Sequence, residues 1–110
     1  FDIAPDRLDD FYEWHNREHM PERLGNPGFH SGRRFLALRG KRQFMVLYET
    51  LSPDNVAGPE YMHNIRFESE WSLSHDLINN SRAIFRVQCS YGHGQGGAVA
   101  SIRFNAADGR

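Results

Sequence analysis

The stretch FMVLY, residues 44–48, is apolar at five consecutive positions. It lies within residues 42–51, RQFMVLYETL, which predict a β-strand because β-branched and aromatic side chains are enriched there. Side chains alternate between the two faces of a strand, so an unbroken apolar run indicates burial on both faces. We therefore expect helices to cover one face of the sheet and a second copy of the sheet to cover the other.

The residues before this strand predict a helix and a hairpin partner. Residues 29–39, FHSGRRFLALR, read as a second strand, joined to residues 42–51 by a short Gly-Lys connection. Further upstream, Pro5 opens a helix whose first turns are rich in aspartate, as the helix dipole favours. Pro21 is expected to end or kink this helix.

The remaining segments complete an α+β pattern. Residues 1–4 read as the end of a strand, residues 60–78 as a kinked helix and residues 83–91 as a strand. The order βαββαβ predicts a ferredoxin-like fold, with a four-stranded antiparallel sheet and two helices on one face. Such a unit would pair sheet to sheet with another, as a homodimer or as a pseudo-dimer within a longer chain.

The expected domain spans residues 1–93, with its first strand truncated. Residues 94–97 continue the glycine-rich stretch GHGQGG as a linker, and residues 98–110 supply an extra strand. FDIAPDR at 1–7 resembles FNAADGR at 104–110, so this extra strand is a candidate for the opening of a second repeat.

Composition limits the classes of function. The chain has 110 residues and a net charge of −1, so neither a nucleic acid nor an anionic membrane surface is favoured as partner. Cys89 is the single cysteine, which excludes an intramolecular disulfide and indicates a reducing, cytoplasmic setting. No apolar run approaches the roughly 18 residues of a membrane span.

Residues 14–23, WHNREHMPER, concentrate the side chains able to do chemistry. His15 to His19 match the H-x-x-E-H spacing of inverted-zincin metalloproteases. Such a site needs a third ligand from a larger domain, so we expect no bound metal and no zinc proteolysis. Leu8, Phe11, Tyr12, His15 and His19 recur at helical spacings of three and four, so they share one helix face and His19 is expected to face the sheet.

The segments EWHNREHMPERL, PGFHSGRRF and FMVLYE resemble the dimeric α/β-barrel superfamily, and within it the EthD-like proteins. The resemblance covers about residues 1–91. It implies a ferredoxin-like unit with a small-molecule pocket between sheet and helices, in a group that includes monooxygenases, isomerases, cyclases and haem-binding members. The chain departs from the pattern at His15, where relatives usually carry tyrosine.

Two interpretations of His19 stay open. As a functional group, its imidazole could serve as general acid or base, with Glu18 tuning it and Arg23 stabilising an enolate or carboxylate. As a structural group, it would bond a backbone carbonyl while Glu18 or Glu22 pairs with an arginine. The further candidate ligand-binding residues are Trp14, His15, Glu22, Arg34 and Arg86.

The resulting functional expectation is a protein that binds a hydrophobic, oxygenated small molecule without a cofactor. It could be an isomerase, cyclase or monooxygenase that uses His19. The alternatives are a non-catalytic binding module for an aromatic metabolite or haem, and one half of a tandem-repeat barrel. The fold alone cannot choose between them, because one fold hosts many chemistries.

Overall fold

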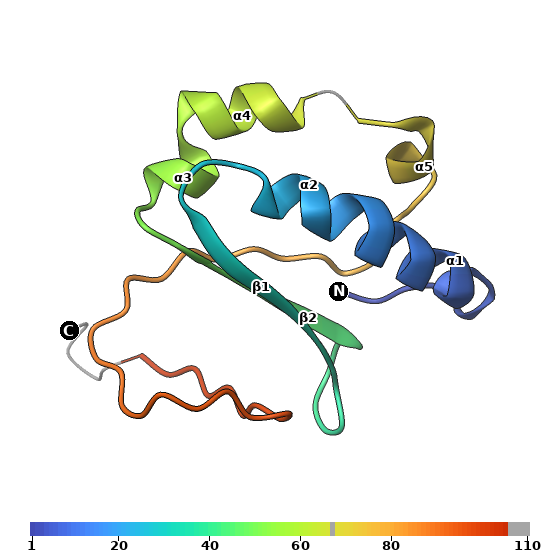
Figure 1. Cartoon of the computed structure of the whole chain (residues 1–110). Coiled ribbons are helices and arrows are strands. Elements are labelled where there is room, and N and C mark those ends of the chain that lie inside the picture. Colours follow the sequence, from blue (N-terminus) through green and yellow to red (C-terminus); the bar gives the residue numbers. More distant parts are fainter. Residues whose placement is uncertain (67, 106–110) are drawn as a thin grey trace.

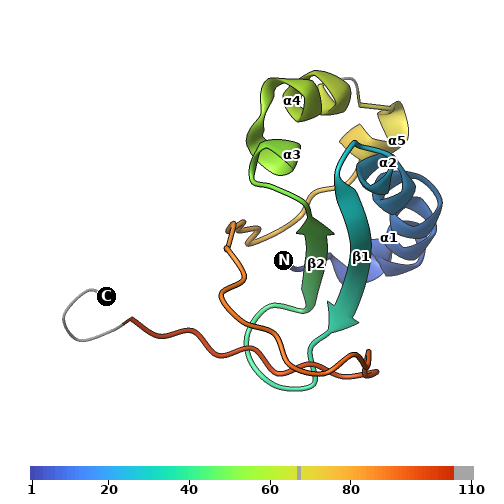
Figure 2. The ribbon, with the colours of Figure 1, turned by 60° about the vertical axis from the view of Figure 1, so that its left-hand side comes forward.

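The computed structural model describes residues 1–66 and 68–105. A long first helix, a two-stranded hairpin and a group of short helices follow one another along the chain (Figure 1). The first helix lies against one face of the hairpin, and residues 79–105 run past it without helix or strand (Figure 2).

The first helix is continuous but changes its winding. It consists of η1 (Pro5–Arg7), α1 (Leu8–Trp14), the π-helical η2 (His15–His19) and α2 (Met20–Leu24). The helix does not end at Pro21. Instead, the N–H of Met20 bonds the carbonyl of His15, five residues back. In an α-helix a proline ring crowds the carbonyl four residues before it, so a wider turn directly ahead of Pro21 relieves that conflict.

The hairpin consists of β1 (Phe29–Leu36) and β2 (Phe44–Thr50), paired antiparallel, which confirms the two strands predicted there. Gly32 lies opposite Tyr48 in the register. A Cβ atom on Gly32 would lie 2.8 Å from the Tyr48 ring and 3.1 Å from the methyl group of Met20. Glycine at this position therefore lets α2 approach the hairpin closely.

The core lies where the first helix meets β2. Phe11 is fully buried, and its ring centroid lies 5.0 Å from that of Phe44 and 5.7 Å from that of Phe1. Ile3 and Trp14 complete the buried cluster. Partly buried apolar side chains surround it, namely Phe1, Leu8, Tyr12, Trp71 and Leu77. The FMVLY strand thus buries one face against the first helix, as its pattern predicted.

Three short helices follow the hairpin: α3 (Asp54–Ala57), α4 (Pro59–Ile65) and α5 (Glu70–Leu73). The single kinked helix predicted for residues 60–78 is wrong, because α4 and α5 are separate. Tyr61 of α4 is buried and stacks on Phe29 at a centroid distance of 5.8 Å, which fixes α4 at the start of β1. Ser69 caps α5 by accepting the N–H of Ser72 at 3.0 Å.

The predicted four-stranded ferredoxin-like fold is wrong. Within the described residues the sheet contains two strands, β1 and β2. Residues 1–4 contribute one isolated bridge, between Asp2 and Ile78, and a backbone exchange between Phe1 and Phe44. Because the helix begins at Pro5, only residues 1–4 lie along the edge of β2. This segment is too short to offer residues 83–91 a strand with which to pair.

The predicted strands at residues 83–91 and 98–104 are not formed. Phe85, Val87 and Tyr91 are 70%, 76% and 93% exposed, so the apolar face expected of this strand is in contact with solvent. The extra strand predicted at residues 98–110 includes residues 106–110, which lie outside the described part. The same five residues make up most of FNAADGR, the predicted opening of a second repeat. No helix in residues 1–66 or 68–105 is long and apolar enough to cross a membrane.

Candidate functional site

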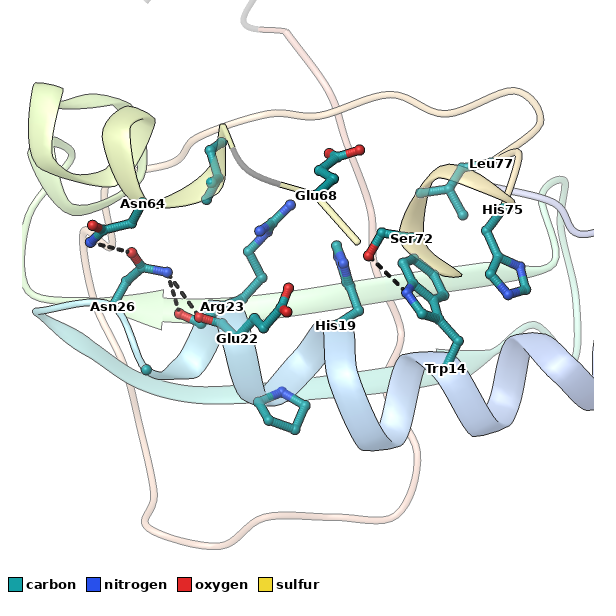
Figure 3. Close-up of a pocket in the computed structure, with 13 residues that line it drawn as sticks. Trp14, His19, Glu22, Arg23, Asn26, Asn64, Glu68, Ser72, His75 and Leu77 are labelled. Atoms are coloured by element: carbon teal, nitrogen blue, oxygen red, sulfur yellow. Dashed lines mark hydrogen bonds between the residues drawn. The ribbon is translucent and has the colours of Figure 1, made fainter. Parts of the chain in front are cut away.

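A cavity of about 460 Å³ lies between the first helix and the α4–α5 region (Figure 3). The resemblance implied a pocket between sheet and helices, but no residue of β1 or β2 lines this one. The lining residues are Trp14, His19, Pro21, Glu22, Arg23, Gly25, Asn26, Asn64, Ile65, Glu68, Ser72, His75 and Leu77. The cavity is therefore a space between helices, with both polar and apolar walls.

His19 lies at the centre of this lining and is half-buried. Its ring centroid is 4.6 Å from that of Trp14. Burial lowers the pKa of His19 to about 4; the charge of Arg23 acts in the same direction and Glu18 opposes it. At neutral pH the imidazole is uncharged. Within residues 1–66 and 68–105, neither of its ring nitrogens has a hydrogen-bond partner, so the structural interpretation, a bond to a backbone carbonyl, is not realised there.

The ring of His15 stacks beside that of His19 at a centroid distance of 5.3 Å, but His15 does not line the cavity. It is 2% exposed, and its Nδ1 lies 2.8 Å from Nη1 of Arg34 on β1. A guanidinium can only donate, so Nδ1 is the acceptor and the proton of the neutral ring resides on Nε2. Burial lowers the pKa of His15 to about 3. His15 and Arg34 thus join the first helix to the hairpin.

Glu18 joins the first helix to α5. Its Oε2 accepts hydrogen bonds from the hydroxyls of Ser69 at 2.7 Å and Ser72 at 3.1 Å. The Ser72 hydroxyl in turn accepts the indole N–H of Trp14 at 3.0 Å. Glu18 does not line the cavity, but this network holds Trp14 and Ser72, two residues that do.

Two other predicted site residues reach the cavity from α2. Glu22 is exposed at its edge; burial raises the pKa of its carboxyl, the nearby Glu18 adds to the effect and Arg23 opposes it. Arg23 is half-buried and extends into the cavity beside His19 (Figure 3). Arg86, by contrast, is exposed in the segment after α5 and is not among the lining residues.

The far wall contains residues that the sequence did not single out. Asn26 is buried, and its amide donates to the carbonyls of Glu22 and Arg23 and accepts from the amide of Asn64 at 3.0 Å. This arrangement closes the end of α2 and ties it to α4. An asparagine directly after the helix-ending Gly25 was the available signal for such a cap.

His75 was also missed. Its ring stacks on Trp14 at a centroid distance of 4.5 Å, so in Figure 3 the indole lies between His75 and His19. The side chain is 1% exposed, and Nε2 lies 2.9 Å from a carboxylate oxygen of Asp10, without the direction needed for a well-formed hydrogen bond. No pattern in the sequence brings His75 to the first helix, since the contact depends on where α5 ends.

No group of three potential metal ligands comes together in the described part of the chain. No family model, curated protein or solved structure matches the chain. The chemistry of the cavity is therefore argued from its own residues.

Proposed function

We propose that the protein binds a small, oxygenated aromatic molecule in the cavity between α2 and α5, with His19 accepting a hydrogen bond from it. One observation carries the proposal: a half-buried, neutral imidazole lines a cavity of about 460 Å³ and its ring nitrogens have no hydrogen-bond partner in the described residues. Its acceptor nitrogen is available, and a hydroxyl from a ligand could donate to it.

The walls of the cavity fit such a ligand. Ile65 and Leu77 offer apolar surface to an aromatic ring, while Arg23 and Asn64 offer polar groups to its oxygen atoms. The volume lies within the range of small-molecule sites, roughly 300–1,000 Å³.

Binding is better supported than strong base catalysis. A general base works best with a pKa near the operating pH, and burial holds the pKa of His19 at about 4. Such an imidazole accepts a hydrogen bond readily but removes a proton from carbon poorly. An enzymatic role as isomerase, cyclase or monooxygenase would require the bound ligand to raise this pKa.

The test is a binding screen with a matched pair of variants. Phenols, aryl alcohols, aryl ketones and aryl carboxylates are titrated against the protein while the imidazole signals of His19 are followed by NMR. His19→Phe keeps an aromatic ring against Trp14 but removes the acceptor. His30→Phe, at an exposed position on β1, is the control.

We expect some of these compounds to move the His19 signals. Their affinity should fall by about tenfold in His19→Phe, the value of one hydrogen bond, and stay unchanged in His30→Phe. If no compound moves the His19 signals of the folded protein, the proposed function is wrong. If His19→Phe bound the compounds as tightly as the unmodified protein, His19 would not be part of the binding site.

A further inference from the structure

We infer that the ligand carries a carboxylate and that Arg23 is the group that binds it. This inference rests on the proposed function and adds the chemical class of the ligand. Arg23 enters the cavity from α2, next to His19 (Figure 3). In residues 1–66 and 68–105, its guanidinium has no hydrogen bond and no ion pair, and it lies 6.0 Å from the centroid of the Tyr61 ring.

The other half-buried arginines of the described chain differ from Arg23 in this respect. Arg7 donates to Asp10 and Ser74, Arg33 to the carbonyl of Gly96, and Arg34 to His15 and Asn16. A guanidinium removed from water normally finds acceptors in this way. Arg23 is half-buried with its donors directed into an open cavity, where a bound molecule can supply the acceptor.

A carboxylate is the group that best matches these donors. The planar guanidinium presents parallel N–H bonds that fit both oxygens of a carboxylate at once. With the carboxylate on Arg23, the rest of a small ligand would reach the apolar surface of Ile65 and Leu77, and a separate hydroxyl could donate to His19. A hydroxyaryl carboxylic acid has a carboxylate, an apolar ring and such a hydroxyl.

The acidic residues at the edge of the cavity act against this charge. Glu22 and Glu68 both line it, but both are exposed, so water and salt screen their effect on an anion held by Arg23. They define the competing possibility, a cationic ligand held by the two carboxylates. Removing one of them should change anion and cation binding in opposite directions.

Arg23 also provides a direct readout. Its charge is one of the causes that lower the pKa of His19. A bound carboxylate would neutralise that charge locally, so the pKa of His19 should rise on binding. A neutral ligand of the same shape would leave the charge of Arg23 in place and should not produce this rise.

The experiment compares three probes at neutral pH that share a phenolic hydroxyl able to donate to His19: 4-hydroxyphenylacetate, 4-hydroxyphenylacetamide and tyramine. Their affinities and their effect on the His19 titration are measured by NMR. The variants are Arg23→Gln, the control Arg33→Gln and the edge variant Glu68→Gln, each checked for folding by a thermal melt. Arg33 is a suitable control because it is an equally half-buried arginine outside the cavity.

We expect 4-hydroxyphenylacetate to bind about tenfold or more tightly than 4-hydroxyphenylacetamide, and to raise the pKa of His19. Arg23→Gln should abolish that preference, Arg33→Gln should retain it, and Glu68→Gln should strengthen 4-hydroxyphenylacetate binding several-fold. Equal or tighter binding of 4-hydroxyphenylacetamide or tyramine at His19 would overturn the inference and leave the proposed function standing. If none of the probes or the screened compounds reached His19, both would be overturned.

Discussion

At the scale of single residues, two histidines one turn apart have different environments. His15 is buried against Arg34, while His19 is half-buried at the cavity. Burial lowers both pKa values, to about 3 for His15 and about 4 for His19. Each ring is therefore uncharged in the folded protein at a pH where the unfolded chain would bind a proton.

These shifts predict that the protein loses stability in mild acid. An unfolded histidine titrates near 6.5, so between that pH and about 4 the unfolded state binds more protons than the folded state. The stabilisation that comes from the two uncharged histidines is fully present above pH 6.5. It is lost as the pH falls toward their pKa values in the folded protein. We expect the free energy of unfolding in urea to be lower at pH 5 than at pH 7.5, by about 2 to 3 kcal/mol for both histidines together after allowance for the partial exposure of His19.

His19→Phe isolates one of the two contributions. The variant cannot take up a proton at this position, so its loss of stability between pH 7.5 and pH 5 should be about half that of the unmodified protein. An identical loss in both proteins would mean that His19 is solvated and titrates near its ordinary value.

The sequence located the site only in part at this scale. It identified His19, Arg23, Glu22 and Trp14, all of which line the cavity, because charged and aromatic residues were concentrated in one short stretch. It could not separate His15 from His19, which helical spacing places on one face. The two rings do stack on each other, and their different environments depend on contacts with partners distant in sequence, such as Arg34 for His15.

At the scale of elements, α5 depends on side-chain contacts because it is only four residues long. An isolated helix of that length is unstable in water. Glu18 holds it through the hydroxyls of Ser69 and Ser72, and Ser69 also caps its first turn. The cavity wall formed by α5 is therefore positioned by a carboxylate on the first helix.

Glu18→Ala should destabilise the protein by about 1–3 kcal/mol, since two hydroxyls lose a charged acceptor. Glu13→Ala is the matched control: Glu13 is exposed and pairs at 2.8 Å with the exposed Arg17, so its loss should cost less than about 1 kcal/mol. Urea melts of the two variants test the difference. A double-mutant cycle of Glu18→Ala with Ser69→Ala should show a coupling of at least about 0.5 kcal/mol; additive effects would contradict the network.

The elements themselves were predictable to different degrees. The first helix and the hairpin follow from strong local patterns: a proline start, acidic first turns and a continuous apolar strand. Residues 83–91 alternate as a strand should, yet a strand forms only where another strand offers its backbone. Whether such a partner exists is a property of the whole sheet and cannot be read from the segment.

At the scale of the whole molecule, the hairpin leaves one face away from the first helix. Gly32 and Tyr48 face α2, so the alternate positions Phe35, Met45 and Leu47 belong to the opposite face. Leu47 is 46% exposed. The segment after α5 contacts this face at Arg33, whose guanidinium donates to the carbonyl of Gly96.

We propose that a second copy of the chain covers this face, and we expect a homodimer at micromolar concentration. The FMVLY strand remains the reason, because its apolar residues alternate between the buried face and the open one. A stable pairing of this kind buries well over about 1,000 Å² in total.

Leu47→Glu would place a charge at the centre of that contact, where burying it without a partner is costly. Light scattering should therefore give the mass of two chains for the unmodified protein and of one chain for Leu47→Glu. Leu38→Glu is the control, because Leu38 is 90% exposed in the hairpin connection and its replacement should leave the dimer intact. A single-chain mass for the unmodified protein would show that residues 79–105 or solvent suffice to cover the face.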